Sequence, residues 1–142
     1  MTKWSVAFDK ANSGLARSVI GDFAGSPVIS RNSAYMMSNA GQLLSVKLNN
    51  GAIRWRLPVG GQSTPLIVDN SIFVVTDTGK IARIKTSTGS LIWSRKISLK
   101  DLQGSYYGPV LGNGLLWVVG SDKKLRAFNP ASGEETLSLS LS

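Results

Sequence analysis

The chain has 142 residues, a hydrophobic fraction of 42%, a charged fraction of 17% and a net charge of +8. This length is enough for one domain with its own core, and the composition excludes an intrinsically disordered chain. The sequence contains no cysteine and no histidine, which excludes disulfide frameworks, thiolate or imidazole metal sites, and nucleophiles activated by histidine.

The beginning of the chain, Met1-Thr2-Lys3-Trp4-Ser5, lacks the apolar segment of a signal peptide. The protein is therefore expected either to be cytosolic or to start after a removed signal. No apolar run approaches the ~20 residues that a membrane helix needs. The basic residues are scattered along the chain, with no run longer than a pair, so the positive charge favours anionic partners without forming a polybasic tract.

Three segments of the chain align with one another without a gap, each from a proline to a glycine 24 residues later. In each copy the proline opens an apolar pair, and a second apolar run and a third, alternating strand follow after short polar turns. A tryptophan stands four residues after the glycine in the first two copies, and the third copy has leucine there. The repeated positions are Pro27, Pro65 and Pro109; Gly51, Gly89 and Gly133; and Trp55, Trp93 and Leu137.

The spacing of the repeat predicts the fold. The prolines are 38 and 44 residues apart, and four short strands in ~40 residues are typical of a β-propeller blade. Val, Ile, Thr and aromatic residues between Gly and Asn/Asp turns favour strands over helices. The prediction is an all-β fold: a propeller segment of about three four-stranded antiparallel blades in an incomplete ring. Residues 1–25 are expected to form the outer strand of a preceding blade and a linker, and the blades are expected at 26–63, 64–107 and 108–142.

The repeat resembles that of the quinoprotein-type propeller family, whose copies end in a turn of the form Ala-x-Asp-x-x-Thr-Gly-x-x-x-Trp. The stretch from Arg83 through Thr88-Gly89 to Trp93 corresponds to this form and matches it at the threonine, glycine and tryptophan. Within the family, the segments around Gly25-Ser26-Pro27 and Tyr107-Gly108-Pro109 look like the later blades of the B-subunit lipoproteins of the outer-membrane β-barrel assembly machinery, in their alphaproteobacterial form. The chain departs from the family at the aspartate of the turn, which is replaced by Lys47, Lys85 and Asn129.

This resemblance implies a function without catalysis. The family's ring has about eight blades, so the chain looks like a carboxy-terminal fragment of an outer-membrane protein assembly lipoprotein. The resemblance implies a periplasmic, outer-membrane-associated scaffold that contacts the barrel-assembly subunit. It also implies no catalytic residue, no metal, no cofactor and no nucleic acid, and membrane contact only through a lipid anchor that this chain lacks.

Two other functions stay open at this point. One is a fragment of a quinone-dependent dehydrogenase, whose family members bind the quinone at the centre of a complete propeller, usually with calcium and often with a cysteine pair. The other is a basic module for nucleic acid or an anionic surface, which rests on the charge of +8 alone.

The candidate site residues fall into two groups. The repeated tryptophans are predicted to pack between blades, and the glycines at the repeat ends are predicted to supply a turn residue with positive φ. The longer connection between repeats mixes Leu, Tyr and Lys, as contact patches do. It is the candidate partner contact, through Lys100, Leu102, Gln103, Tyr106 and Tyr107.

An open stack of blades should expose apolar faces at both ends, so the fragment is expected to associate with itself. The end faces are predicted to carry Val28, Ile29, Tyr35 and Met37 on the first blade, and Val110, Leu116, Val118 and Phe128 on the last.

Overall fold

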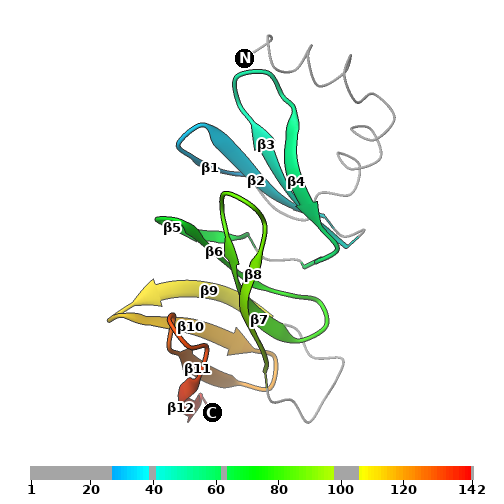
Figure 1. The fold of residues 1–142 in the computed structure, drawn as a ribbon. Helices are drawn as coiled ribbons and strands as arrows, with labels where there is room; N and C mark the ends of the chain where they lie inside the picture. The colour runs from blue at the N-terminus through cyan, green and yellow to red at the C-terminus, as the bar shows by residue number, and fades with distance from the viewer. Residues whose placement is uncertain (1–26, 39–40, 62–63, 98–105, 142) are drawn as a thin grey trace.

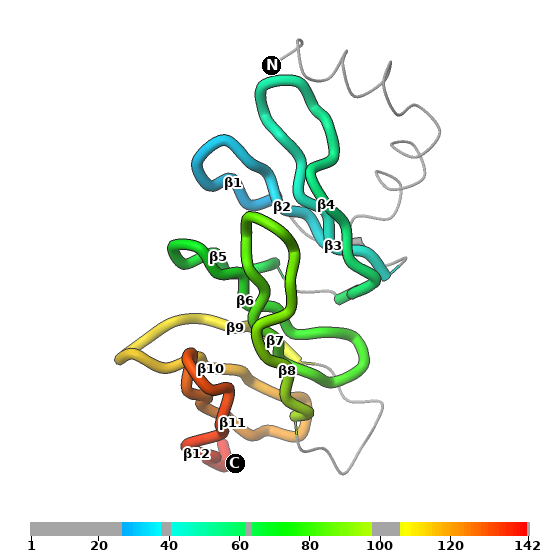
Figure 2. The backbone as a smooth tube through the Cα atoms, viewed as in Figure 1, coloured from blue at the N-terminus to red at the C-terminus, as the bar shows by residue number. Residues whose placement is uncertain are grey.

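The structure is a computed structural model that describes residues 27–38, 41–61, 64–97 and 106–141. These residues form three four-stranded antiparallel sheets and no helix. The sheets lie side by side like the blades of a fan, with the second between the first and the third (Figure 1). The course of the backbone shows the same stacking (Figure 2). The predicted all-β fold, a partial propeller of three blades, is confirmed, whereas the strand expected within residues 1–25 lies outside the described residues.

Within each blade the strands follow one another in chain order across the sheet. The first blade consists of β1 (Val28–Ser30), β2 (Ser33–Ser38), β3 (Gln42–Lys47) and β4 (Ile53–Leu57). The second consists of β5 (Leu66–Val68), β6 (Ser71–Val75), β7 (Lys80–Lys85) and β8 (Leu91–Lys96). The third consists of β9 (Tyr106–Gly112), β10 (Leu115–Gly120), β11 (Lys124–Phe128) and β12 (Glu135–Ser140).

The first hairpin of each blade closes with a two-residue turn. Its first residue has a positive φ in all three copies: 56° at Arg31, 51° at Asp69 and 51° at Asn113. Left-handed residues in such a turn match the right-handed twist of the two strands that it joins. The repeat therefore conserves backbone geometry at a place where its residue types differ.

The core lies between the blades. We call the side of a blade that packs on the preceding blade its leading face, and the opposite side its trailing face. The first core layer joins the trailing face of blade one (Tyr35, Met37, Leu43) to the leading face of blade two (Ile72, Val74, Ala82, Ile84). The second joins the trailing face of blade two (Phe73, Val75, Ile81) to the leading face of blade three (Leu116, Val118, Phe128).

These layers correct the prediction of the end faces. Tyr35 and Met37 on the first blade are buried between blades, not exposed at the end of the stack. The same is true of three of the four residues predicted on the last blade, Leu116, Val118 and Phe128. The reason is that alternation along a strand reveals two faces, but not which of them meets the next blade.

Candidate functional site

The first tryptophan of the repeat connects two blades. Trp55 on β4 donates a hydrogen bond from its indole Nε1 to the backbone oxygen of Thr86, in the last turn of the second blade, over 2.8 Å. Its ring also covers Gly89 in that blade, where an added Cβ would lie 2.8 Å from Trp55 Cδ2. Glycine is therefore required beneath the indole, and the pair serves to dock one blade on the next.

The second tryptophan repeats this contact one blade further on. Trp93 on β8 donates from Nε1 to the backbone oxygen of Pro130 over 2.8 Å. Two arginines of the same blade add donors to this turn: Arg83 Nη1 bonds the Pro130 oxygen over 3.3 Å, and Arg95 Nη2 bonds the Ser132 oxygen over 3.0 Å. The turn of the third blade thus receives three side chains from the second.

The turn that carries the family's aspartate closes in each copy without that residue. The amide of the glycine donates to the backbone oxygen four residues earlier: Gly51 to Lys47, Gly89 to Lys85 and Gly133 to Asn129. Asn129 also accepts a bond at Oδ1 from the amide of Ala131 over 2.8 Å. Asparagine therefore caps its turn with its own side chain, whereas the caps of the two lysine turns come from other residues: Asn50 Oδ1 accepts from the amide of Ala52, and Thr88 Oγ1 accepts from the amide of Ser90.

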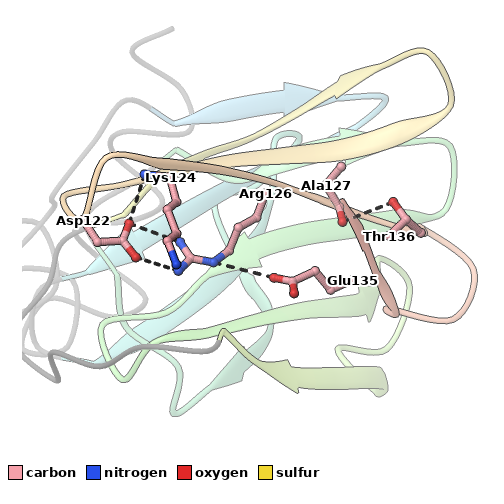
Figure 3. Close-up of polar contacts among 6 residues, drawn as sticks. All are labelled: Asp122, Lys124, Arg126, Ala127, Glu135 and Thr136. Atoms are coloured by element: carbon pink, nitrogen blue, oxygen red, sulfur yellow. Dashed lines mark hydrogen bonds and ion pairs between the residues drawn. The ribbon is translucent and has the colours of Figure 1, made fainter. Parts of the chain in front are cut away.

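A buried arginine distinguishes the third blade. Arg126 on β11 is only 3% exposed, and its Nη2 lies 2.6 Å from Oδ2 of Asp122 (Figure 3). Nη1 contacts the other oxygen of this carboxylate at 3.3 Å, and Nε lies 3.6 Å from Oε1 of Glu135. The guanidinium also lies 5.8 Å from the centre of the Tyr106 ring. The charge is thus enclosed between two carboxylates and an aromatic ring on the leading face of the blade.

This cluster shifts three pKa values. The hydrogen bond from Arg126 lowers the pKa of Asp122 below its ordinary value of 3.8. The bond to Asp122 in turn raises the pKa of Arg126, so both groups stay charged through the physiological range. Burial raises the pKa of Tyr106, which keeps its phenol neutral. The cluster is a fixed ion pair and offers no group whose charge changes near neutral pH.

The sequence interpretation missed Arg126 and its pairing with Asp122. The signal was present in the repeat, because Arg126 occupies the strand position held by Leu44 and Ala82 in the other copies. A single cation at an otherwise apolar core position requires a buried counter-ion.

The predicted partner contacts separate at the start of β9. Tyr106 is buried in the core layer between blades two and three, whereas the adjacent Tyr107 is 67% exposed. The other three, Lys100, Leu102 and Gln103, lie outside the described residues. The repeated prolines also differ, since Pro27 is exposed while Pro65 and Pro109 are buried.

Two grooves open at the outer rim, one in each interface between blades. The first has a volume of about 350 Å³ and a largely apolar lining that includes Leu57, Val59 and Leu91. The second lies against Arg95, Lys96 and Glu135 and is strongly charged. The equivalent grooves therefore differ in chemistry, and only the first suits an apolar side chain of a partner.

Neither a metal-binding group of side chains nor a membrane-spanning helix occurs among the described residues. Within residues 27–38, 41–61, 64–97 and 106–141, no three or more His, Cys, Asp and Glu side chains gather into a group that could hold a metal ion. In the same ranges, no helix is long and apolar enough to cross a membrane.

Comparison with known families decides where the chain belongs. The profile of the family described as outer membrane protein assembly factor BamB matches residues 2–95 and again residues 46–141. The chain belongs to this BamB family. A comparison with curated proteins finds no match.

Solved structures support the fold of this BamB-family chain. BamB from Moraxella catarrhalis superposes with a TM-score of 0.67 at 19% identity, over 83% of this chain and 38% of that protein. The quinohemoprotein alcohol dehydrogenase from Comamonas testosteroni superposes with a TM-score of 0.68 at 11% identity, over 85% of this chain and 22% of the enzyme. A europium-containing methanol dehydrogenase superposes with a TM-score of 0.65 at 17% identity, over 84% of this chain and 25% of that enzyme. The chain thus spans well under half the length of these proteins, and the likeness to them concerns the fold.

Proposed function

We propose that this chain is a non-enzymatic scaffold of outer-membrane protein assembly, acting in the periplasm by contact with the barrel-assembly subunit. The observation that carries the proposal is the match of the BamB family profile across residues 2–141. The architecture supports it: the indoles of Trp55 and Trp93 each donate a hydrogen bond to the following blade and so join the blades into one stacked body. Turns and outer strands lie on the surface of that body, where proteins commonly present their binding residues.

The proposed contact is the connection that precedes the third blade, through Lys100, Leu102, Gln103 and Tyr107. The support from the described residues is the exposure of Tyr107 at its end, since exposed tyrosines are enriched in protein interfaces. Tyr106 is not proposed as a partner contact, because its ring is buried in the core layer, where it anchors the end of the connection.

A binding measurement with the periplasmic part of the barrel-assembly subunit tests the proposal. The double variant Lys100→Glu/Leu102→Ser should weaken binding at least about tenfold, because it changes the charge and removes the apolar anchor of the connection. The control is Lys85→Glu, which makes the same charge change on an exposed residue at the opposite end of β7 from the connection. No binding, or equal weakening by both variants, would contradict the proposal. Binding that disappears on moving from low to physiological salt would instead favour a module for anionic surfaces.

The dehydrogenase alternative rests on the superposition with two dehydrogenases. The residues that the structure describes do not fit a quinone with a calcium ion. The sequence has no cysteine. In the part of the chain that the structure describes, no three or more His, Cys, Asp or Glu side chains gather into a group that could hold a metal ion.

A further inference from the structure

Arg83 of the second blade is a half-buried cation whose contacts with the described residues are all neutral. Its Nε donates to Ser71 Oγ over 2.8 Å, and its Nη1 lies 3.3 Å from the backbone oxygen of Pro130. The guanidinium also lies 5.7 Å from the centre of the Phe73 ring. The ion pairs among the described residues both belong to Arg126. Arg83 thus holds its charge between two blades without a carboxylate from this part of the chain.

These contacts leave donors of Arg83 for a ligand. The Pro130 oxygen already accepts the shorter bond from Trp93 Nε1, at 2.8 Å. Nη2 makes no hydrogen bond to a described residue. Because a guanidinium presents five N–H groups in a planar fork that matches a carboxylate, Arg83 is able to bind an anion while Ser71 and Pro130 hold it in place.

The guanidinium lies at a pocket of about 460 Å³ between blades two and three. Arg83 lines this pocket, and so do both of its acceptors, Ser71 and Pro130, so the charged end of the side chain borders the open space. The pocket is also bordered by the first hairpin turns of blades two and three, which lie at one edge of the fold (left in Figure 1). A ligand therefore reaches the charge from the side of these turns.

The equivalent pocket between blades one and two is smaller, with a volume of about 200 Å³. There Arg31 of blade one donates to Asn70 Oδ1 of blade two over 3.1 Å, and this bond joins the two sides of the pocket. By the repeat, Arg31 corresponds to Asp69 and Asn70 corresponds to Gly114. Since Gly114 has no side chain, the second pocket has no such bond and is wider.

The cation and an exposed leucine also distinguish the second pocket. Arg83 occupies the repeat position of Ser45, which is fully buried in blade one. Leu111 on β9 lines the second pocket and is 46% exposed, whereas its counterpart Ile67 packs against the first core layer. Val68 and Pro130 add further apolar atoms to the lining. A ligand that covers Leu111 gains free energy from burial of apolar surface beside the charge.

The charges around the pocket favour a ligand with one negative charge. The carboxylate in the lining is that of Asp69, which is exposed and not within ion-pair distance of Arg83. Because Asp69 repels anions, a doubly charged phosphate ester is disfavoured relative to a carboxylate.

We propose that the pocket between blades two and three binds an organic carboxylate with a short apolar body. The carboxylate accepts hydrogen bonds from Arg83, and the apolar body packs on Leu111 and Val68. The group belongs either to a free small acid or to an acidic side chain of a polypeptide. The pocket lies at the opposite end of β9 from Tyr107. This inference goes beyond the proposed scaffold function and is tested on the chain alone, so its failure is distinguishable from loss of binding to the assembly subunit.

An NMR titration of the isotopically labelled chain with phenylacetate, at constant physiological salt, tests the site. The amide signals of Asn70, Gly114 and Ala131 at the pocket should shift saturably. Acetate lacks the apolar body and phenylacetamide lacks the charge. Each should bind at least about fivefold more weakly than phenylacetate, because it keeps only one of the two contacts.

Two pairs of variants locate the binding. Arg83→Gln should raise the dissociation constant of phenylacetate at least about tenfold. Its matched control is Arg95→Gln, which removes the same charge and also a donor to the same turn of blade three, but lies outside the pocket lining. Leu111→Ser should weaken binding at least about threefold. Its control is Ile92→Ser, since both side chains are 46% exposed and only Leu111 lines the pocket.

A blocked dipeptide distinguishes the two sources of the carboxylate. Acetyl-Leu-Glu-amide should shift the same amide signals if the pocket accepts a polypeptide, and acetyl-Leu-Gln-amide should not. Binding of phenylacetate without binding of the acidic dipeptide would assign the pocket to a free small acid. The proposal would be overturned by the absence of a saturable shift at the pocket, by acetate that binds as tightly as phenylacetate, or by equal weakening in the two arginine variants. Equal weakening by Leu111→Ser and Ile92→Ser would overturn it as well, and this pair does not depend on the contacts of Arg83 with the next blade.

Discussion

The indole of Trp93 lies so close over Gly133 of the next blade that an added Cβ would be 2.6 Å from Trp93 Cε3. The same indole donates to the oxygen of Pro130, three residues before the glycine. The Trp93 side chain thus makes two contacts with one turn: it donates a hydrogen bond to the carbonyl of Pro130, and its ring packs on the backbone of Gly133. The tryptophan of one repeat thus contacts the glycine of the following repeat, which explains why both residues recur in the sequence.

Gly133→Ala should destabilise the chain for two separable reasons. The residue has a φ of +79°, which costs an alanine roughly 1–2 kcal/mol, and the new methyl group would overlap the indole at a further cost of about 1–3 kcal/mol. The control is Gly114→Ala, which has a φ of +75° but no atom within 4 Å of the added Cβ. Denaturant unfolding should show a larger loss of unfolding free energy for Gly133→Ala than for Gly114→Ala. Equal losses of unfolding free energy would contradict the role assigned to the indole.

Trp93→Ala should lower the free energy of unfolding by about 3–5 kcal/mol, because it removes a large apolar side chain from the second core layer and leaves the Pro130 oxygen without this donor. A loss below about 1 kcal/mol would count against the docking contact. Combining Trp93→Ala with Gly133→Ala sharpens the test, since removal of the ring leaves space for the new methyl group. In that background, Gly133→Ala should cost less than it does in the unaltered chain, and the contact that remains is with Arg95 Cγ, 2.8 Å from the added Cβ.

The sequence was sufficient to predict the blades, because each copy repeats the same strands and turns. It did not reveal which face of a strand meets the next blade. Tyr35 and Leu116 were assigned to open ends, but the twist and stacking direction of the sheets place them inside. The same limit applies to Tyr106 and Tyr107. β9 begins before Pro109, so the two tyrosines are strand residues with opposite orientations and not two positions of one loop.

Acid should weaken the chain through Asp122. The pKa of this carboxyl is lowered in the folded state by the bond from Arg126, so its stabilising contribution is complete above the unfolded value of 3.8 and is lost as the pH falls through the folded value. Asp122→Asn should cost about 1.5–3 kcal/mol at neutral pH, the range for a hydrogen bond to a charged group.

The pH dependence of stability distinguishes an ion pair of Asp122 with Arg126 from a role of residue 122 that does not depend on its charge. Unfolding of Asp122→Asn and of the unaltered chain should differ at pH 7 and converge in strong acid, once Asp122 is protonated in both states of the unaltered chain. Arg126→Met should strongly reduce the same acid-dependent difference, because the carboxyl then keeps only the smaller contributions of Lys124 to its lowered pKa. A constant difference across the acid range would contradict the assigned pair.

Pyrroloquinoline quinone with calcium should cause no saturable increase in the melting temperature of the chain at high salt. A ligand of the native state raises stability by ~2.7 kcal/mol at a hundred-fold excess over its dissociation constant, which thermal melts detect readily. The quinone carries several carboxylates and the chain carries +8, so weak, nonspecific binding is expected at low salt and should vanish as salt is added. The measurement is therefore a melting series at low and high salt, with and without calcium. A saturable shift that needs calcium and persists at high salt would show a built cofactor site and would favour the dehydrogenase function over the scaffold.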